Sequence, residues 1–130
     1  MENSYQQKRI LYVDDDLQSR LLIGYLIGKF YDITLCATAK EALQILETNF
    51  FSLILLDIRL EGEMTGIELL SEIRKMPGHE YTPAVAVTAF AFDEDREQIL
   101  SSGFADYFAK PIAINQFKEM VKTYVKVAEY

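Results

Sequence analysis

Several apolar segments of this sequence end in side chains that could do chemistry together. Asp14 and Asp15 follow the first such segment, and Asp57 follows the run Leu-Ile-Leu-Leu. Thr88 ends the segment Pro-Ala-Val-Ala-Val-Thr, and Lys110 follows Asp-Tyr-Phe-Ala. Carboxylates, a hydroxyl and an ammonium group can bind a divalent cation and stabilise a transferring phosphoryl group if they converge on one place.

Three converging carboxylates would raise one another's pKa values unless a cation lay among them. Mg²⁺ is the natural candidate, because it prefers oxygen ligands and keeps several waters. The sequence has neither G-x-x-x-x-G-K nor G-x-G-x-x-G, so nucleotide binding is poorly supported. A carboxylate beside Mg²⁺ can instead act as a nucleophile that accepts a phosphoryl group, with Lys110 as the cation and Thr88 as the hydrogen-bond donor.

The arrangement of apolar segments predicts the elements that must position these side chains. Continuous apolar runs of strand length alternate with helical patterns five times, which indicates an α/β fold with a doubly wound, five-stranded parallel sheet and helices on both faces. The flavodoxin-like strand order 2-1-3-4-5 would place Asp14, Asp15 and Asp57 together at the switch point. The expected strands are 8–13, 31–37, 52–56, 83–88 and 106–110, and the expected helices are 17–29, 38–49, 67–76, 93–102 and 114–127.

Local signals support the helix positions. Asp16 is well placed as the N-cap of the first helix, with Arg20 on its exposed side. Thr38 and Glu41 have the spacing of a capping box. The apolar residues of the first helix recur at helical spacing; they are Leu17, Leu21, Leu22, Tyr25 and Leu26. Phe and Tyr residues at helical spacing are expected in the core.

Length and composition limit the possible domain number, partners, location and metal sites. The chain has 130 residues, half of them hydrophobic, and a net charge of −7. Its length and composition predict one globular domain over residues 8–130 after a flexible N-terminus at residues 1–7. This charge opposes direct nucleic-acid binding. No apolar run is long enough for a signal peptide or membrane span, so the cytoplasm is the expected location. One cysteine and one histidine exclude a zinc cluster, and His79 is expected to be solvated without a chemical role.

Over essentially its whole length the sequence resembles the receiver domain of two-component response regulators. The phrases Leu-Ile-Leu-Leu-Asp-Ile and Asp-Tyr-Phe-Ala-Lys-Pro-Ile are very similar to those of the family. Each match taken singly is weak, but together, in order and at strand ends, they are specific. The matching positions are Asp14-Asp15, Asp57, Thr88-Ala89 and Lys110-Pro111.

The resemblance implies roles for the acidic residues. Asp57 would be the phosphoacceptor. Asp15 would bind Mg²⁺ directly and Asp14 mainly through water, with Asp57 and the backbone carbonyl of Arg59 completing the protein ligands. Histidine kinases or histidine phosphotransfer proteins would be the phosphoryl donors.

It also implies roles for the later strand ends. Thr88 would hydrogen-bond a phosphoryl oxygen, Lys110 would pair with the phosphoryl group, and the Lys110–Pro111 peptide bond would be cis. Tyr107 matches the aromatic residue whose inward rotation accompanies the shift of Thr88. A downstream protein or a second copy would bind the face formed by the fourth helix, the fifth strand and the fifth helix.

Two features depart from the commonest family form. The loop from Arg59 to Gly66 is one residue longer and has Glu61 where a proline is usual. Arg59 and Phe90 stand where the family tunes dephosphorylation, and a bulky Phe90 could restrict the attacking water. Phe90 in this position suggests a longer-lived phosphoryl group.

Other functions remain open on the sequence alone. Asp14-Asp15-Asp16 has the Asp-x-Asp spacing of haloacid dehalogenase-type aspartyl-phosphate phosphatases, although Thr88 is not followed by their later acidic pair. A receiver-like interaction module that is never phosphorylated is a second alternative. If the chain is a receiver domain, it assists its own phosphorylation and the hydrolysis of its own phosphoryl group, but its function is signalling. It would act either alone or as part of a hybrid kinase or larger regulator.

Overall fold

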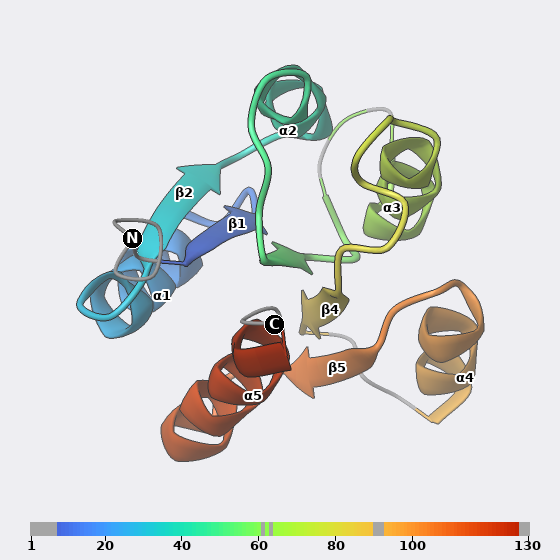
Figure 1. The fold of residues 1–130 in the computed structure, drawn as a ribbon. Coiled ribbons are helices and arrows are strands. Elements are labelled where there is room, and N and C mark those ends of the chain that lie inside the picture. Colours follow the sequence, from blue (N-terminus) through green and yellow to red (C-terminus); the bar gives the residue numbers. More distant parts are fainter. Residues whose placement is uncertain (1–7, 61, 63, 90–92, 128–130) are drawn as a thin grey trace.

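A five-stranded parallel sheet forms the centre of the molecule (Figure 1). The computed structural model describes residues 8–60, 62, 64–89 and 93–127, so the expected flexible segment 1–7, Glu61 and Phe90 lie outside the described residues. The strand order is β2-β1-β3-β4-β5, as predicted. The elements are β1 (Arg9–Val13), α1 (Leu17–Gly28), β2 (Asp32–Cys36), α2 (Ala39–Leu46), β3 (Leu53–Leu56), α3 (Gly66–Arg74), β4 (Ala84–Thr88), α4 (Asp93–Ser101), β5 (Asp106–Ala109) and α5 (Ile114–Val127).

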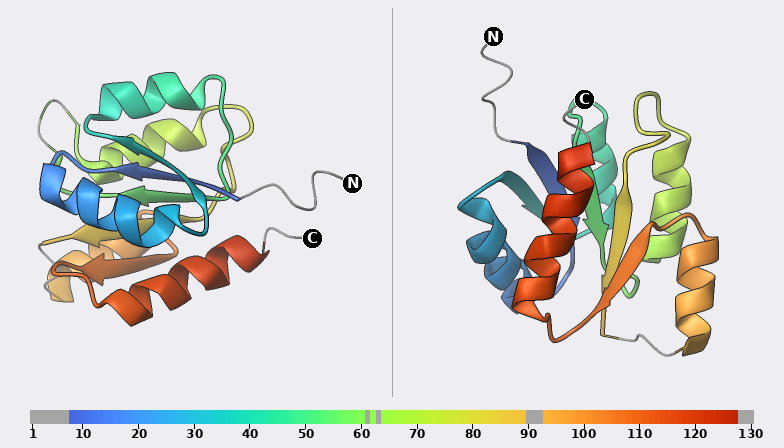
Figure 2. Two further views of the ribbon diagram at one scale, coloured as in Figure 1. Left: turned by 90° about the vertical axis from the view of Figure 1, so that its left-hand side faces the viewer. Right: turned by 60° about the horizontal axis from the view of Figure 1, so that its bottom comes forward.

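Helices cover both faces of the sheet, with α1 and α5 on one face and α2, α3 and α4 on the other (Figure 2). All four residues of β3 and all five of β4 are buried. Alternate strand residues enter two separate apolar cores, one on each side, because successive side chains of a strand point to opposite faces. This explains why the central strands are continuously apolar in sequence.

The register of the sheet aligns the strand ends that carry the chemical side chains. Val13 of β1 pairs with Leu56 of β3, and the Asp57 N–H donates to the Val13 carbonyl at 2.9 Å. At the other side, the Lys110 N–H donates to the Thr88 carbonyl at 2.9 Å. Lys110 therefore lies just beyond β5, at the same edge as the residues that follow β1 and β3.

Helix caps follow the sequence signals, with one addition. The Asp16 carboxylate accepts a hydrogen bond from the Ser19 N–H, which confirms it as the N-cap of α1. Thr38 and Glu41 form the expected capping box. A second capping box, Thr65 with Glu68, starts α3 at Gly66, so this helix begins within the segment that was expected to be loop.

Of the five apolar residues that recur at helical spacing in α1, Leu26 packs against the core, but the other four are exposed. Ile23 and Ile27 are the buried residues of this helix, whereas Leu17, Leu21 and Tyr25 are 58%, 62% and 65% exposed. Arg20 is also not a free solvent-facing side chain, since its Nη1 donates to the Asp14 carbonyl at 2.7 Å. A helix that is apolar on all sides does not reveal its inward face by spacing alone.

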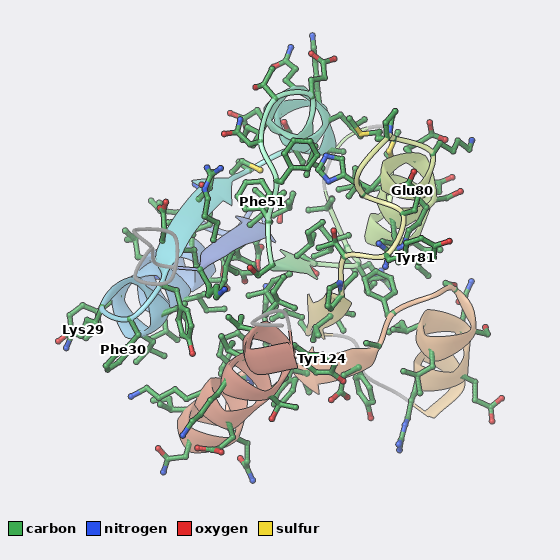
Figure 3. The ribbon with its side chains drawn as sticks, in the orientation of Figure 1. Lys29, Phe30, Phe51, Glu80, Tyr81 and Tyr124 are labelled. Atoms are coloured by element: carbon green, nitrogen blue, oxygen red, sulfur yellow. The ribbon has the colours of Figure 1, made fainter. Side chains whose placement is uncertain are left out.

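The environment of His79 also differs from the expectation. This side chain is buried, its Nε2 lies 2.7 Å from the Leu46 carbonyl, and its ring stacks on Phe50. Leu46 ends α2 and lies 33 positions earlier in the chain, so no local pattern indicated this hydrogen-bond partner. By contrast, Tyr81 and Phe30 lie on the surface (Figure 3).

Within the described residues, none of the helices combines the length and apolar character needed to cross a membrane.

Candidate functional site

Three carboxylates meet at the carboxyl edge of the sheet. Asp14 and Asp15 follow β1, and Asp57 follows β3. One oxygen from each lies within 4.8 Å of the others. Asp14 is fully buried and Asp57 is 5% exposed. The prediction that the topology brings these three residues together is confirmed.

Lys110 lies between two of the carboxylates. Its Nζ is 2.6 Å from Asp14 Oδ2 and 3.3 Å from Asp57 Oδ2. Burial lowers the pKa of Lys110, but the hydrogen bonds and charges of Asp14 and Asp57 outweigh it and raise the pKa above its ordinary value. The ammonium group therefore stays charged and partly neutralises the acidic cluster.

Asp57 is held in an environment that disfavours its ionised form. Burial is the main cause and the charge of Asp14 the next, and together they raise its pKa to about 6. Lys110 and the Arg59 N–H, which donates to Asp57 Oδ1 at 3.1 Å, act in the opposite direction. At neutral pH the carboxylate is ionised but incompletely compensated, which is a suitable state for a nucleophile beside a cation.

This raised pKa predicts a pH dependence of stability in metal-free buffer. Between pH ~4, the pKa of Asp in an unfolded chain, and pH ~6 the native state binds more protons at Asp57 than the unfolded state does. The free energy of unfolding should therefore fall by on the order of 2 kcal/mol as the pH rises through this window. Denaturant titrations of the protein and of Asp57→Asn, with chelator present, measure it. A pH profile identical in the two proteins would contradict the assignment.

Thr88 and Tyr107 occupy the positions expected of them along the sheet. Thr88 is the last residue of β4 and is fully buried. Tyr107 of β5 pairs with Ala86 of β4 and is half-buried. The Arg96 guanidinium of α4 lies 5.4 Å from the centre of the Tyr107 ring. The peptide bond between Lys110 and Pro111 is cis, as the resemblance implies.

The segment after Asp57 is held against the end of β3. The Gly66 N–H donates to the Ile58 carbonyl at 2.9 Å, and a β-carbon on Gly66 would come within 2.9 Å of the Ile58 Cα and closer still to the Asp57 carbonyl. Only glycine fits this approach of α3 to the strand end. The Arg59 side chain is exposed, and the expected role of its carbonyl remains a prediction.

We expect Gly66→Ala to destabilise the protein at the start of α3. The added methyl group must push α3 away from the backbone of Asp57 and Ile58, so the free energy of unfolding should fall by about 2 kcal/mol or more. Gly28→Ala is a matched control, because its β-carbon would make an ordinary 3.6 Å contact with Ile33. Thermal and denaturant unfolding of the two variants compare them. Equal stability of both would show that the approach is not tight.

Two residues of this site were not anticipated from the sequence. The Tyr12 hydroxyl donates to Asp14 Oδ2, and Arg20 donates to the Asp14 carbonyl. Burial, followed by the hydrogen bond to Asp14, raises the pKa of Tyr12, so its hydroxyl stays protonated. A signal for Tyr12 existed, because residues two apart in a strand share a face.

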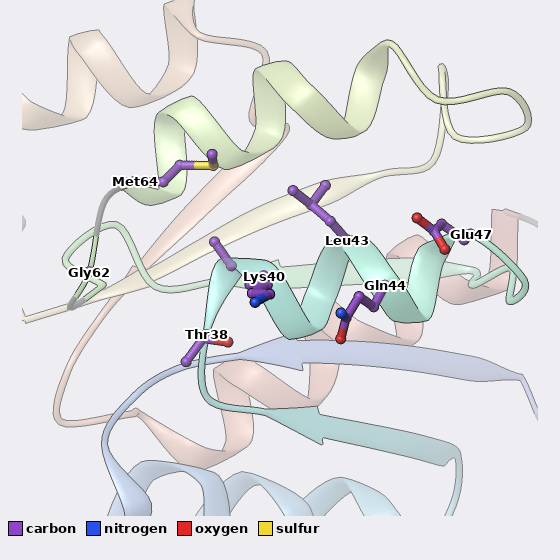
Figure 4. Close-up of a pocket in the computed structure, with 8 residues that line it drawn as sticks. Thr38, Lys40, Leu43, Gln44, Glu47, Gly62 and Met64 are labelled. Atoms are coloured by element: carbon purple, nitrogen blue, oxygen red, sulfur yellow. The ribbon is translucent and has the colours of Figure 1, made fainter.

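Two grooves are present among the described residues, and one of them includes a side chain of the acidic site. One of about 450 Å³ lies between the start of α1 and the β5–α5 connection, and it includes Lys110 and Leu22. The other, of about 520 Å³, lies between α2 and the segment before α3, where Leu43 of α2 points toward α3 (Figure 4). The residues labelled in the second groove are Thr38, Lys40, Leu43, Gln44, Glu47, Gly62 and Met64.

The donor set fits a magnesium ion. Three carboxylates offer hard oxygen atoms within a short span, and two of them are buried. The raised pKa of Asp57 indicates that Lys110 alone does not compensate the cluster. Asp14, Asp15 and Asp57 are thus the residues that would hold the ion.

Several known proteins are similar to this chain in sequence. The chain is 39% identical over 119 residues to an uncharacterized 14.6 kDa protein of Leptolyngbya boryana, covering 91% of this chain and 90% of that protein. It is 31% identical over 119 residues to the polar-differentiation response regulator DivK of Brucella ovis, covering 91% and 96% of the two chains. With the histidine-protein kinase BarA of Escherichia coli it shares 33% identity over 116 residues, 88% of this chain but 12% of that protein.

A solved structure has the same fold. The receiver domain of the sensor histidine kinase PA1611 from Pseudomonas aeruginosa, described with a magnesium ion in its active site cleft, superimposes with a TM-score of 0.84 at 29% identity. The match covers 92% of this chain and 98% of that one. Residues 10–122 also match the sequence pattern of the response regulator receiver domain. The chain therefore belongs to the response regulator receiver family of two-component signalling.

Proposed function

We propose that this domain is a signalling switch in which Asp57 accepts a phosphoryl group from a histidine of a partner protein, with Mg²⁺ bound. The observation that carries the proposal is the position of Asp57 within reach of both the Lys110 ammonium and two further carboxylates. A carboxylate so placed can attack phosphorus while its surroundings neutralise the incoming charge.

The reaction would proceed in one displacement. A carboxylate oxygen of Asp57 forms a bond to phosphorus, and the bond from phosphorus to the donor imidazole nitrogen breaks. The electron pair stays on that nitrogen, and the imidazole leaves neutral if its other nitrogen carried the only proton. Mg²⁺ held by Asp14, Asp15 and Asp57 would supply positive charge beside the phosphoryl oxygens. Lys110 would leave its shared position and pair with the phosphoryl group, and the Thr88 hydroxyl would donate to it.

The proposed consequence is a change of conformation at α4, β5 and α5. The phosphoryl group carries about −1.5 to −2 charges in place of the single negative charge of the Asp57 carboxylate, and this would draw Thr88 and Lys110 toward Asp57. Tyr107 would then turn inward and give up its contact with Arg96, shifting the population toward an active form. A downstream protein or a second copy would recognise this face.

An exposed apolar face beside the site supports binding of a phosphodonor. Leu17, Leu21 and Leu22 of α1 are all more than 40% exposed, and the 450 Å³ groove runs from Leu22 to Lys110. A donor histidine must approach Asp57 across this edge. We propose that a histidine kinase or a phosphotransfer protein binds here, in the cytoplasm, whether the domain acts alone or within a longer protein.

Mapping the phosphorylated residue tests the proposal. The protein is incubated with acetyl phosphate and Mg²⁺, the acyl phosphate is trapped by borohydride reduction, and the modified residue is located by peptide mass spectrometry. Modification of Asp57 is expected. Modification of Asp14 would instead support the aspartyl-phosphate phosphatase, and no modification by acetyl phosphate or any phosphohistidine donor would support a receiver-like module that is not phosphorylated.

A further inference from the structure

Tyr12 places a hydroxyl at the acidic site from inside the apolar core. Its side chain is fully buried in β1 and belongs to the core that contains Ile23 and Phe117. A tyrosine in such a position needs a hydrogen-bond partner for its hydroxyl. That partner is Asp14 Oδ2, because Tyr12 and Asp14 lie two residues apart on one side of the chain.

The donors to Asp14 differ in how firmly they are held. Lys110 shares Oδ2 with Tyr12 but also contacts Asp57, and in the proposed reaction it moves to the phosphoryl group. The Asp16 N–H donates to the other oxygen, Oδ1, at 2.9 Å. The Tyr12 ring is enclosed by the core and cannot follow Lys110. Its hydroxyl is therefore the side-chain donor that stays with Asp14 Oδ2 through the reaction.

We propose that Tyr12 is a positioning residue of the metal site, whose hydroxyl keeps the Asp14 carboxylate oriented for Mg²⁺ while Lys110 is exchanged between carboxylate and phosphoryl group. This inference rests on the proposed Mg²⁺-dependent phosphorylation of Asp57. Groups that hydrogen-bond a metal ligand fix its direction, and their loss lowers metal affinity although they never touch the ion.

Calorimetric titration with MgCl₂ tests this directly. Tyr12→Phe keeps the ring in the core and removes the hydroxyl, and we expect its Kd for Mg²⁺ to rise about tenfold. Tyr12→Leu also lacks the hydroxyl and should show the same loss. Tyr124→Phe is the matched control, since it removes a hydroxyl that donates to the Ala105 carbonyl at 3.3 Å, away from the acidic residues. Its affinity should equal that of the unmodified protein.

A second readout separates positioning from general damage. In acetyl phosphate assays at increasing Mg²⁺, Tyr12→Phe should need about tenfold more Mg²⁺ for half-maximal rate, with a maximal rate near that of the unmodified protein. A Kd for Mg²⁺ within twofold of the unmodified protein, or a loss confined to Tyr12→Leu, would overturn the role of the hydroxyl. If the unmodified protein binds Mg²⁺ but is not phosphorylated, the proposed function fails while the titration still decides the role of Tyr12.

Discussion

Asp57→Asn is expected to abolish phosphorylation by acetyl phosphate in the presence of Mg²⁺. The amide cannot form the acyl phosphate, and it also removes the negative charge of one of the three carboxylates that surround the proposed metal position. The loss should exceed a factor of about 10³, because removal of the nucleophile leaves no parallel route. The measurement is the rate of phosphoprotein formation by intact mass spectrometry or phosphate-affinity electrophoresis.

Asp16→Asn provides the matched control. Asp16 lies two residues from Asp14 but is exposed and caps α1, and asparagine is an equally good N-cap. Its phosphorylation rate should stay within about twofold of the unmodified protein, since surface changes of this kind have small effects. Phosphorylation of Asp57→Asn at the normal rate would show that another residue is the acceptor.

Removal of Lys110 should have the second-largest effect, on both reaction and stability. Lys110→Ala takes away the cation that bridges Asp14 and Asp57, and its side chain is only 17% exposed. The phosphorylation rate at saturating Mg²⁺ should fall about a hundredfold, the scale for loss of a group that stabilises transition-state charge. The assay is the one used for Asp57→Asn.

The same variant should unfold more easily in metal-free buffer. Asp14 is fully buried and would lose its ammonium partner, so the free energy of unfolding should fall by about 3 kcal/mol. Addition of Mg²⁺ should recover part of this loss, because a cation again lies among the carboxylates. Denaturant titrations with chelator and with Mg²⁺ separate the two contributions.

Lys75→Ala is a suitable control for Lys110→Ala. Lys75 pairs with Glu72 at 3.0 Å, but its side chain is 69% exposed. An exposed pair within a helix contributes only about 0.5 kcal/mol. If Lys110→Ala and Lys75→Ala changed stability equally and left phosphorylation intact, Lys110 would be an ordinary surface lysine.

The central strands and the helix caps were predictable from the sequence. The continuous apolar runs predicted β3 and β4 as strands covered on both faces, because such strands need apolar side chains at every position. The alternation of these runs with helical patterns predicted the parallel sheet. Asp16 and Thr38 were recognised as caps, since capping depends on contacts within three residues. Predicted ends of several strands differed by one residue, as in β5, which ends at Ala109 rather than Lys110.

The buried side of α1 and the burial of His79 were not predictable from the sequence, for a physical reason. Leu17, Leu21 and Tyr25 satisfy helical spacing, yet α1 turns Ile23 and Ile27 inward instead. Apolar residues surround this helix, so its rotation depends on how well each side packs against the sheet. His79 was expected at the surface because its loop is polar, but its partner Leu46 is distant in sequence.

The sequence by itself determined the class of fold, the strand order and the set of residues at one edge of the sheet, because each depends on local periodicity and on general rules of parallel sheets. Only the tertiary structure decided how those residues are connected. Lys110 bridges Asp14 and Asp57, Tyr12 reaches Asp14 from the core, and the pKa of Asp57 is raised by burial. Such properties depend on distances of a few ångströms and on exclusion of water, which arise only when segments remote in sequence pack together.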